Sequence, residues 1–427
     1  MPTSAPTPGG LGSAGLRPLA RRRGGAREAT VGFVLVGGSA FILLGLGPRL
    51  LGAAAFSGVG IIWTVSTVFG VGVATPIEQV INRRMNSRSP HAIRTPLLTL
   101  LAMAAVAALV CIGFIGRLPS SSALPATLAG CLLAVVGWVL TAAVRGRLAG
   151  SGDLVGYSVV LGTEAGTRLV LAALAVLLRS HSDVLLPAAV GAPLVVAALV
   201  GLRWRIPAVD DEATSSAPVR WEQLAFVLVA LGFQGCVNLA ALLIEARVGA
   251  TQPGATGQFV AASTYFRVPL LLTGGVLTSA LVVLSTAWVD RDLTRFHRSL
   301  RRSTWQVGLL TTVPSLVLLL LAPVLLPVYY GSDLDLPWVL LLGLASSTIL
   351  AALGAALTQS LLATGRSVWA GLVWIVSAAV TVVALLATPS LGPSTAFALM
   401  IGPALASGVL FWTAGAVERS MRREVAQ

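Results

Sequence analysis

The stretch Asn238–Pro269, NLAALLIEARVGATQPGATGQFVAASTYFRVP, contains two apolar runs joined by a short turn rich in Gly, Pro and Thr. The first run ends at Glu245 and Arg247, and the second begins near Gln258 and carries Arg267. An arginine in the middle of a membrane helix costs about 2.5–3.5 kcal/mol, so it should face a partner or a wet cavity rather than lipid. The stretch predicts two membrane helices, with a cation set into the second.

The composition is that of a membrane protein. The chain has 427 residues, of which 56% are hydrophobic and 11% charged, and its mean hydropathy is +0.88. Soluble proteins are about one quarter charged. The net charge of +13 comes from arginines that lie between apolar runs instead of on one compact face. We therefore expect membrane lipid, and no nucleic acid, as a partner.

The apolar runs are long enough to predict an all-α polytopic fold, since a membrane helix needs about 20 mainly apolar residues. Six runs precede and six follow the loop Arg203–Arg220. The twelve are Thr30–Leu46, Ser57–Val80, Pro96–Gly116, Pro125–Val144, Val155–Leu178, Val184–Leu202, Trp221–Ile244, Gln258–Trp288, Val307–Tyr329, Pro337–Ala363, Val368–Ala387 and Gly392–Ala414.

The arginines predict the topology. With the N-terminus inside, 23 arginines fall in inside segments, and the outside loops hold only Arg49, Arg117, Arg179 and Arg247. This asymmetry follows the positive-inside rule. It predicts an even number of spans with both termini cytoplasmic. The membrane is expected to be the plasma (inner) membrane of a bacterium.

The predicted domains are a disordered basic tail (1–28), an N-terminal six-helix bundle (29–202), a cytoplasmic linker (203–220), a C-terminal six-helix bundle (221–415) and a cytoplasmic tail (416–427). The two halves look like parallel repeats related by an axis along the membrane normal. Each begins with a helix pair that has an Arg at its outer end, a Gly-bearing turn, and then a helix that starts with small and aromatic residues.

Four groups of polar residues are candidates for function. Arg267 is either a cation of a substrate cavity or an arginine that snorkels to the interface. Glu164 and Arg168 are four apart, which places them on one helix face as a structural or a switchable pair. Gln234 and Asn238 line the cavity or bond to a neighbouring helix. Glu78 and Gln79 are expected at a solvated helix end.

No catalytic or metal-binding pattern is found in the sequence. The three cysteines lie singly in apolar runs, and the three histidines lie in loops. Asp333 and Asp335 are expected in a solvated outer loop. We predict no enzyme activity, no metal and no cofactor.

Three segments resemble the polysaccharide flippase branch of the multidrug/oligosaccharidyl-lipid/polysaccharide (MOP) exporter superfamily. They are LLGAAAFSGVGIIWTVSTVFGVGVATPI (50–77), RGRLAGSGDLVGYSVV (145–160), and NLAALLIEARVG (238–249) followed by GQFVAASTYFRVPLLL (257–272). The resemblance extends from Ala29 to about Ala414. It implies two six-helix bundles in a V around a central cavity that opens alternately to the two membrane faces.

The resemblance also implies export of a lipid-linked sugar. Arg267 matches a commonly basic position, whereas Ala240 stands where many relatives carry an acid, and Val282–Val283 where a proline is common. The first hypothesis is a flippase for an anionic lipid-linked saccharide whose pyrophosphate contacts Arg267 and Arg168. Alternatives are a lipid II flippase, a drug or cation antiporter coupled to protons or sodium through Glu164, a membrane glycosyltransferase or polymerase, and a scaffold that does not transport.

Overall fold

The computed structural model describes residues 26–86, 94–115, 124–179, 182–203, 220–331, 336–388 and 391–426. In these ranges the chain is helical and has no strands, so the predicted all-α fold class is confirmed. The helices are α1 (Ala26–Phe69), η1 (Gly70–Ala74), α2 (Thr75–Asn86), α3 (Arg94–Ile115), α4 (Leu124–Gly150), α5 (Leu154–Leu177), α6 (Ser182–Leu202), α7 (Arg220–Asn238), α8 (Ala240–Val248), α9 (Ala255–Val289), α10 (Leu293–Tyr330), α11 (Trp338–Ala363), α12 (Ser367–Leu386) and α13 (Pro393–Ala426).

The first two predicted spans lie in one continuous stretch. Thr30–Asn82 is apolar and helical throughout except at Gly52, whose φ of 74° and ψ of 163° are non-helical. Glycine adopts a positive φ without the steric cost that a Cβ imposes. The chain therefore changes direction at this single residue, where the sequence predicted a longer turn.

Ten described helical stretches are long and apolar enough to cross a membrane, and eleven if the bent pair formed by α7 and α8 is one span. The stretch Thr30–Asn82 counts once in this total although it contains two of the twelve predicted spans. The α7–α8 pair bends by 43° at Leu239, inside the span predicted from Trp221 to Ile244.

Several predicted features fall outside the described residues. They include most of the tail 1–28, of which Ala26–Glu28 begin α1, and all of the linker except Arg203 and Arg220. Arg117, Asp333 and Asp335 also lie outside them. At the C-terminal end, α13 continues to Ala426, through most of the predicted tail 416–427. The domain boundaries thus stay a prediction.

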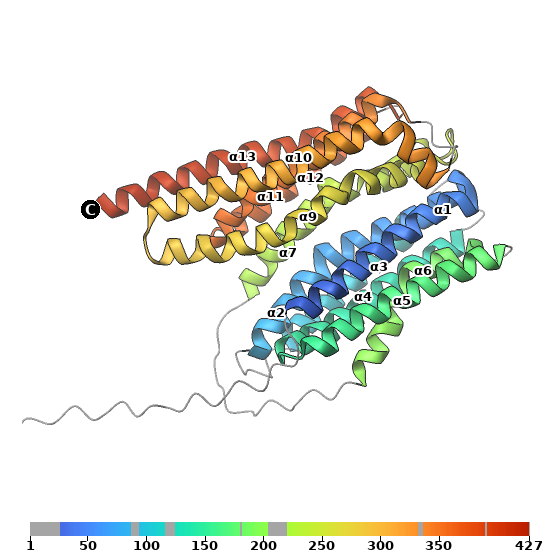
Figure 1. Cartoon of the computed structure of the whole chain (residues 1–427), viewed down its shortest axis with the longest axis horizontal. Coiled ribbons are helices and arrows are strands. Elements are labelled where there is room, and N and C mark those ends of the chain that lie inside the picture. Colours follow the sequence, from blue (N-terminus) through green and yellow to red (C-terminus); the bar gives the residue numbers. More distant parts are fainter. Residues whose placement is uncertain are drawn as a thin grey trace, which may run out of the picture.

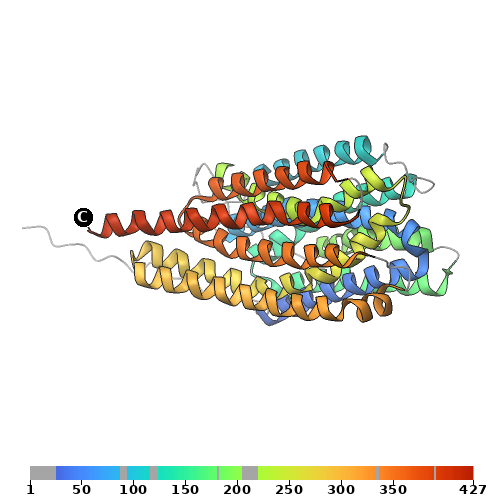
Figure 2. The same cartoon turned by 90° about the horizontal axis from the view of Figure 1, so that it is seen from above.

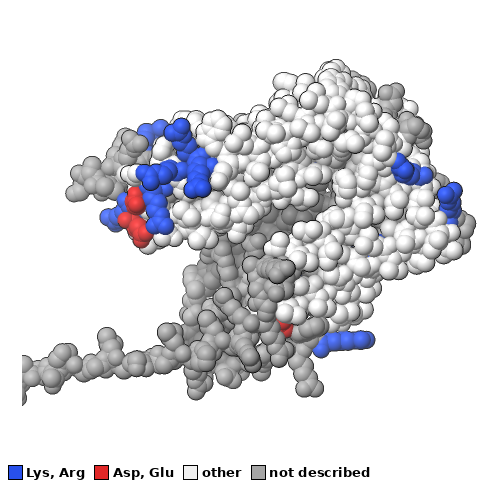
Figure 3. All heavy atoms as spheres, viewed as in Figure 1, with Lys and Arg blue, Asp and Glu red and all other residues white. Residues whose placement is uncertain are grey.

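The helices form an N-terminal group (α1–α6, with η1) and a C-terminal group (α7–α13). The two groups converge at one end and diverge at the other (Figure 1). In the N-terminal group, α5 packs on α1 and α6, and α4 packs on α2 and α6. In the C-terminal group, α7 packs on α12, α9 on α10, and α11 on α13. Seen from above, the long helices of both groups run roughly along the long axis (Figure 2). The surface is hollowed between the groups where they diverge (Figure 3).

The convergent end is closed by contact between α1 and α9. The amide of Gly257 donates to Ser57 Oγ at 3.1 Å, and a Cβ at Gly257 would overlap the carbonyl oxygen of Ala53. Only glycine allows the two backbones this approach. Beside it, Phe56 of α1 and Phe259 of α9 belong to one fully buried apolar cluster.

A second contact at the same end joins α1 to the end of α10. Arg49 Nε donates to the carbonyl oxygen of Tyr329 at 3.0 Å, and the Tyr329 hydroxyl donates to the carbonyl of Phe41. The rings of Phe41 and Tyr329 are stacked, with centroids 4.5 Å apart. The two groups are therefore held together at this end by backbone, apolar and aromatic contacts.

Candidate functional site

Arg267 lies twelve residues from the start of α9, which is about 18 Å along the helix at 1.5 Å per residue. Its side chain is half-buried and reaches α7, where it donates to Asn238 Oδ1 at 2.6 Å and to the carbonyl oxygen of Val237. Both acceptors are neutral. No ion pair involves Arg267 in the described part of the chain, so its positive charge is not compensated there.

The hydrogen bonds continue from Arg267 to the contact between the two groups. Asn238 Nδ2 donates to Gln234 Oε1, one helical turn earlier on α7. Gln234 and Leu231 lie against Gly72 in η1, on the N-terminal group. A π-helical segment inside a longer helix is frequently found at functional sites. Arg267 and the pair Gln234 and Asn238, which the sequence analysis gave as two groups, thus form one polar row that ends at this junction.

The N-terminal group contains a separate set of buried charges. Arg168 Nη2 lies 2.8 Å from Glu164 Oε1, so the four-residue spacing on α5 produces the predicted pair. Arg168 Nη1 also donates to Ser39 Oγ at 3.1 Å and to the carbonyl oxygen of Val36, both on α1. Glu164 and Arg168 are 1% and 3% exposed. The pair therefore fastens α5 to α1.

This pair is part of a larger network that the sequence did not predict. Arg145 of α4 binds Glu78 of α2 with an Nη2–Oε2 distance of 3.0 Å, and its Nη1 lies 3.7 Å from Glu164 Oε2. The Tyr157 hydroxyl donates to Glu78 Oε1 at 2.9 Å. The Trp138 ring lies against the guanidinium of Arg145, 5.1 Å from its Cζ. Two carboxylates and two guanidinium groups from three helices, α2, α4 and α5, thus neutralise each other.

The prediction for the environment of Glu78 was wrong. It was expected at a solvated helix end, but its residue is only 7% exposed and its carboxylate binds two side chains. Arg145, which directly follows the predicted span Pro125–Val144, was likewise one of the 23 arginines assigned to inside segments, whereas α4 continues past it to Gly150 and leaves it 4% exposed. Both residues follow the apolar centres of their runs, where hydropathy alone does not distinguish a helix end from a loop.

The predicted substrate residues fall into two places. Arg267, Asn238 and Gln234 share the polar row described above. In the described residues Arg168 contacts Glu164, Ser39 and Val36, all within the N-terminal group. The described residues therefore do not join Arg168 to Arg267. Among the same residues no cluster of His, Cys, Asp and Glu could hold a metal, and the three cysteines are buried thiols.

No protein-family model and no curated protein matches the chain. Solved structures do match. An inward-facing multidrug resistance MATE family transporter of the MOP superfamily aligns with a TM-score of 0.67 and 15% identity over 92% of this chain and 96% of its own. An outward-facing structure of such a transporter gives 0.56 and 14% over 92% and 97%.

A third match is a MOP superfamily transporter from Pyrococcus furiosus, described as having a binding pocket of reverse polarity that suggests a different function. It aligns with a TM-score of 0.60 and 15% identity over 92% of this chain and 94% of its own. At these identities the likeness concerns the fold, which extends over nearly the whole chain. The protein is a multi-pass membrane protein with the fold of the MATE family transporters of the MOP superfamily.

Proposed function

We propose that the protein is an alternating-access transporter that moves an anionic amphipathic substrate outward across the plasma membrane, namely a lipid-linked oligosaccharide or polysaccharide precursor. The pyrophosphate of the substrate would bind Arg267, and the saccharide would occupy the polar region beside Asn238 and Gln234. The lipid tail would stay in the bilayer. A lipid II flippase is a variant of the same proposal with a different saccharide.

The observation that carries the proposal is the uncompensated charge of Arg267. A half-buried guanidinium whose acceptors among the described residues are neutral retains donors and a positive charge for an incoming anion. Arginine also suits phosphate because its planar fork presents parallel N–H groups. The position of Arg267 supports the same reading, because its row of contacts leads to the junction between the two groups.

The charge distribution supports an inward-open state. Arg295, Arg298, Arg301 and Arg302 lie near the start of α10, whereas Arg49 contacts its end. By the positive-inside rule the first of these ends would face the cytoplasm. The groups diverge toward that end, and the higher TM-score is the one to the inward-facing neighbour.

The test is flipping by the purified protein in proteoliposomes that contain a fluorescent short-chain polyprenyl-pyrophosphate oligosaccharide. Loss of a charge-assisted hydrogen bond costs about 1.5–3 kcal/mol, so Arg267→Gln should reduce flipping about 10- to 100-fold. Arg267→Lys should retain part of it. Arg247→Gln, which removes an exposed charge from the end of α8, is the matched control. Wild-type flipping by Arg267→Glu would exclude this role.

Alternating access has its own test at the closed end. Gly257→Val would push a side chain against the backbone of Ala53, and overpacking of this kind costs about 1–3 kcal/mol. Spin labels at Leu178 and Thr251, exposed on the two groups, should then report longer distances. Gly274→Val in the same helix, where a Cβ meets nothing within 4 Å, is the control. An unchanged distance distribution in Gly257→Val would argue against opening at this contact.

A drug or cation antiporter is the second candidate. The structural neighbours include multidrug resistance transporters, and Glu164 Oε2 is buried without a hydrogen-bond partner. A carboxylate in this state could exchange a proton during transport. Proton-coupled export of a cationic dye that is lost in Glu164→Gln, with no flipping of the anionic lipid, would favour this candidate over the first.

A further inference from the structure

The connection between α9 and α10 carries a concentration of arginines. Five occur in twelve residues: Arg291, Arg295, Arg298, Arg301 and Arg302. The nearby acids are Asp290 and Asp292, which leaves a local charge of +3 (five minus two). Basic side chains are visible at the free end of the C-terminal group in Figure 3. All five arginines are exposed.

Asp290 and Asp292 both contact Arg295, at one edge of this cluster. Asp292 caps α10 by accepting from the amide of Arg295 at 2.8 Å, and the Asp290 carboxylate lies 3.6 Å from Arg295 Nη1. In the described residues no ion pair involves Arg298, Arg301 or Arg302. Arg291 is likewise without an ion pair there, so most of the uncompensated charge is that of the second and third turns of α10.

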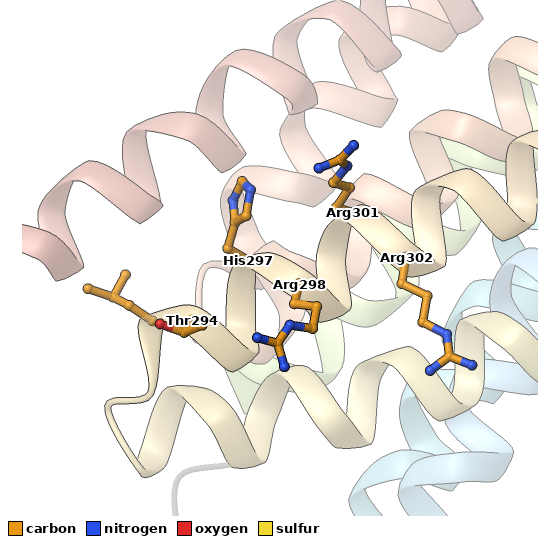
Figure 4. Close-up of a pocket in the computed structure, with 6 residues that line it drawn as sticks. Thr294, His297, Arg298, Arg301 and Arg302 are labelled. Atoms are coloured by element: carbon orange, nitrogen blue, oxygen red, sulfur yellow. The ribbon is translucent and has the colours of Figure 1, made fainter.

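Two hollows lie beside these turns and share Arg298 and Arg302. One, of about 520 Å³, is lined also by Thr294, His297 and Arg301 (Figure 4). In that view Arg298 and Arg302 point toward the neighbouring helix and Arg301 points away from it. The other hollow, of about 510 Å³, lies between α9 and α10.

The α9–α10 groove has a polar and an apolar part. Arg298 and Arg302, four residues apart, stand on one face of α10. The opposite wall, on α9, consists of Gly275 and Ser279 with Val276, Ala280 and Val283. A ligand that fills the groove would thus place an anion at the arginines and apolar groups against α9.

The height of the arginines agrees with the membrane surface. Trp305 follows Arg302 by one turn and is 62% exposed, as is typical of tryptophans at the interface. Beyond it α10 exposes Leu309, Val313 and Leu320, which are 54%, 54% and 74% exposed. Arg298 and Arg302 are therefore at the depth of lipid headgroups, at the boundary of the apolar surface.

We propose that the α9–α10 groove binds an anionic phospholipid of the adjacent leaflet, with its headgroup phosphate between Arg298 and Arg302. Charge complementarity selects the anion, and the apolar wall with the exposed surface beyond Trp305 selects a ligand that carries acyl chains. Basic pockets between membrane helices are known to bind anionic headgroups. The site is on the α9–α10 pair and does not depend on the substrate of Arg267.

The experiment measures binding of phosphatidylglycerol to the full chain by native mass spectrometry, with phosphatidylcholine as competitor. Each arginine near an anionic headgroup contributes about fivefold in affinity, so Arg298→Gln with Arg302→Gln should weaken binding about 30-fold. Arg179→Gln with Arg366→Gln removes the same charge from exposed positions elsewhere and should leave binding unchanged.

Further measurements distinguish a lipid from free phosphate as the ligand, and a loss of lipid binding from a loss of folding. Inorganic phosphate and soluble glycerophosphoglycerol should not displace phosphatidylglycerol at matched concentration. Thermal unfolding in phosphatidylcholine nanodiscs should be equal for wild type and both double variants. In phosphatidylglycerol nanodiscs, only the Arg298/Arg302 variant should lose the increase in Tm. The proposal would be overturned if Arg179→Gln with Arg366→Gln weakened phosphatidylglycerol binding as much as Arg298→Gln with Arg302→Gln does. It would also be overturned if the Arg298/Arg302 variant bound the lipid like the wild type, or if inorganic phosphate displaced the lipid.

Discussion

The two helix groups differ in whether the charges of their inward-facing arginines are neutralised by carboxylates. In the N-terminal group, Arg145 and Arg168 face Glu78 and Glu164, and the network is neutral. In the C-terminal group, the hydrogen bonds of Arg267 to described residues go to the neutral oxygens of Asn238 and Val237. Placing an arginine inside a membrane costs free energy. Carboxylates of the protein neutralise this charge in the N-terminal group, whereas no described carboxylate does so in the C-terminal group.

This difference distinguishes structural from binding charges more clearly than burial does. The compensated arginines each contact residues of other helices and hold four helices together. Removing one of them leaves a buried carboxylate without its counter-charge, which lowers the free energy of unfolding. In the proposed function the counter-charge of Arg267 is the pyrophosphate of the substrate, so removing Arg267 should affect ligand binding more than stability. The predictions below measure this separation.

The largest effect is expected at Arg145. Arg145→Gln leaves Glu78 buried without its ion-pair partner, and breaking a buried pair in this way typically costs about 3–5 kcal/mol. Thermal unfolding of the purified protein should show a corresponding drop in Tm. Arg147→Gln, two residues further along α4 and exposed, is the control and should unfold like the wild type. Equal Tm values for the two variants would contradict a structural role for the network.

A smaller loss of unfolding free energy is expected when Glu164 and Arg168 are replaced together. Glu164→Gln and Arg168→Gln each leave one charge unpaired, whereas the double variant leaves none on α5. The double-mutant cycle should therefore show a coupling energy of about 1–3 kcal/mol, measured from unfolding free energies. Additive losses would mean that the 2.8 Å contact contributes nothing net, and that Arg145 alone compensates Glu164.

The helices were predictable from the sequence and the network was only half predictable, for a physical reason. Apolar length determines a membrane span, so the predicted Gln258–Trp288 differs from α9, Ala255–Val289, by three residues at one end and one at the other. A four-residue spacing places Glu164 beside Arg168 without knowledge of the fold. These are local properties, and they follow from helix geometry.

Glu78 and Arg145 are 67 residues apart, and their contact depends on how α2 packs on α4. No local period indicates it. The positive-inside rule even points the other way, because it assigns an arginine after an apolar run to a loop. The row from Arg267 to Gln234 was not predictable for the same reason. Arg267 and the pair Gln234 and Asn238 were predicted as two groups from their polarity, but that they form one row depends on how α9 packs beside α7.

The smallest stability effect, and the most informative one, is expected at Arg267. Arg267→Gln removes an uncompensated half-buried charge together with two hydrogen bonds, so the desolvation recovered offsets the bonds lost and unfolding free energy should change by less than about 1 kcal/mol. Flipping should nevertheless fall in the same preparation. Adding the anionic substrate should raise the Tm of the wild type and leave that of Arg267→Gln unchanged, because a ligand stabilises only the state that binds it. If Arg267→Gln instead destabilised the protein as strongly as Arg145→Gln, Arg267 would be a structural charge like those of the N-terminal group. The contrast between the groups would then no longer support a binding role.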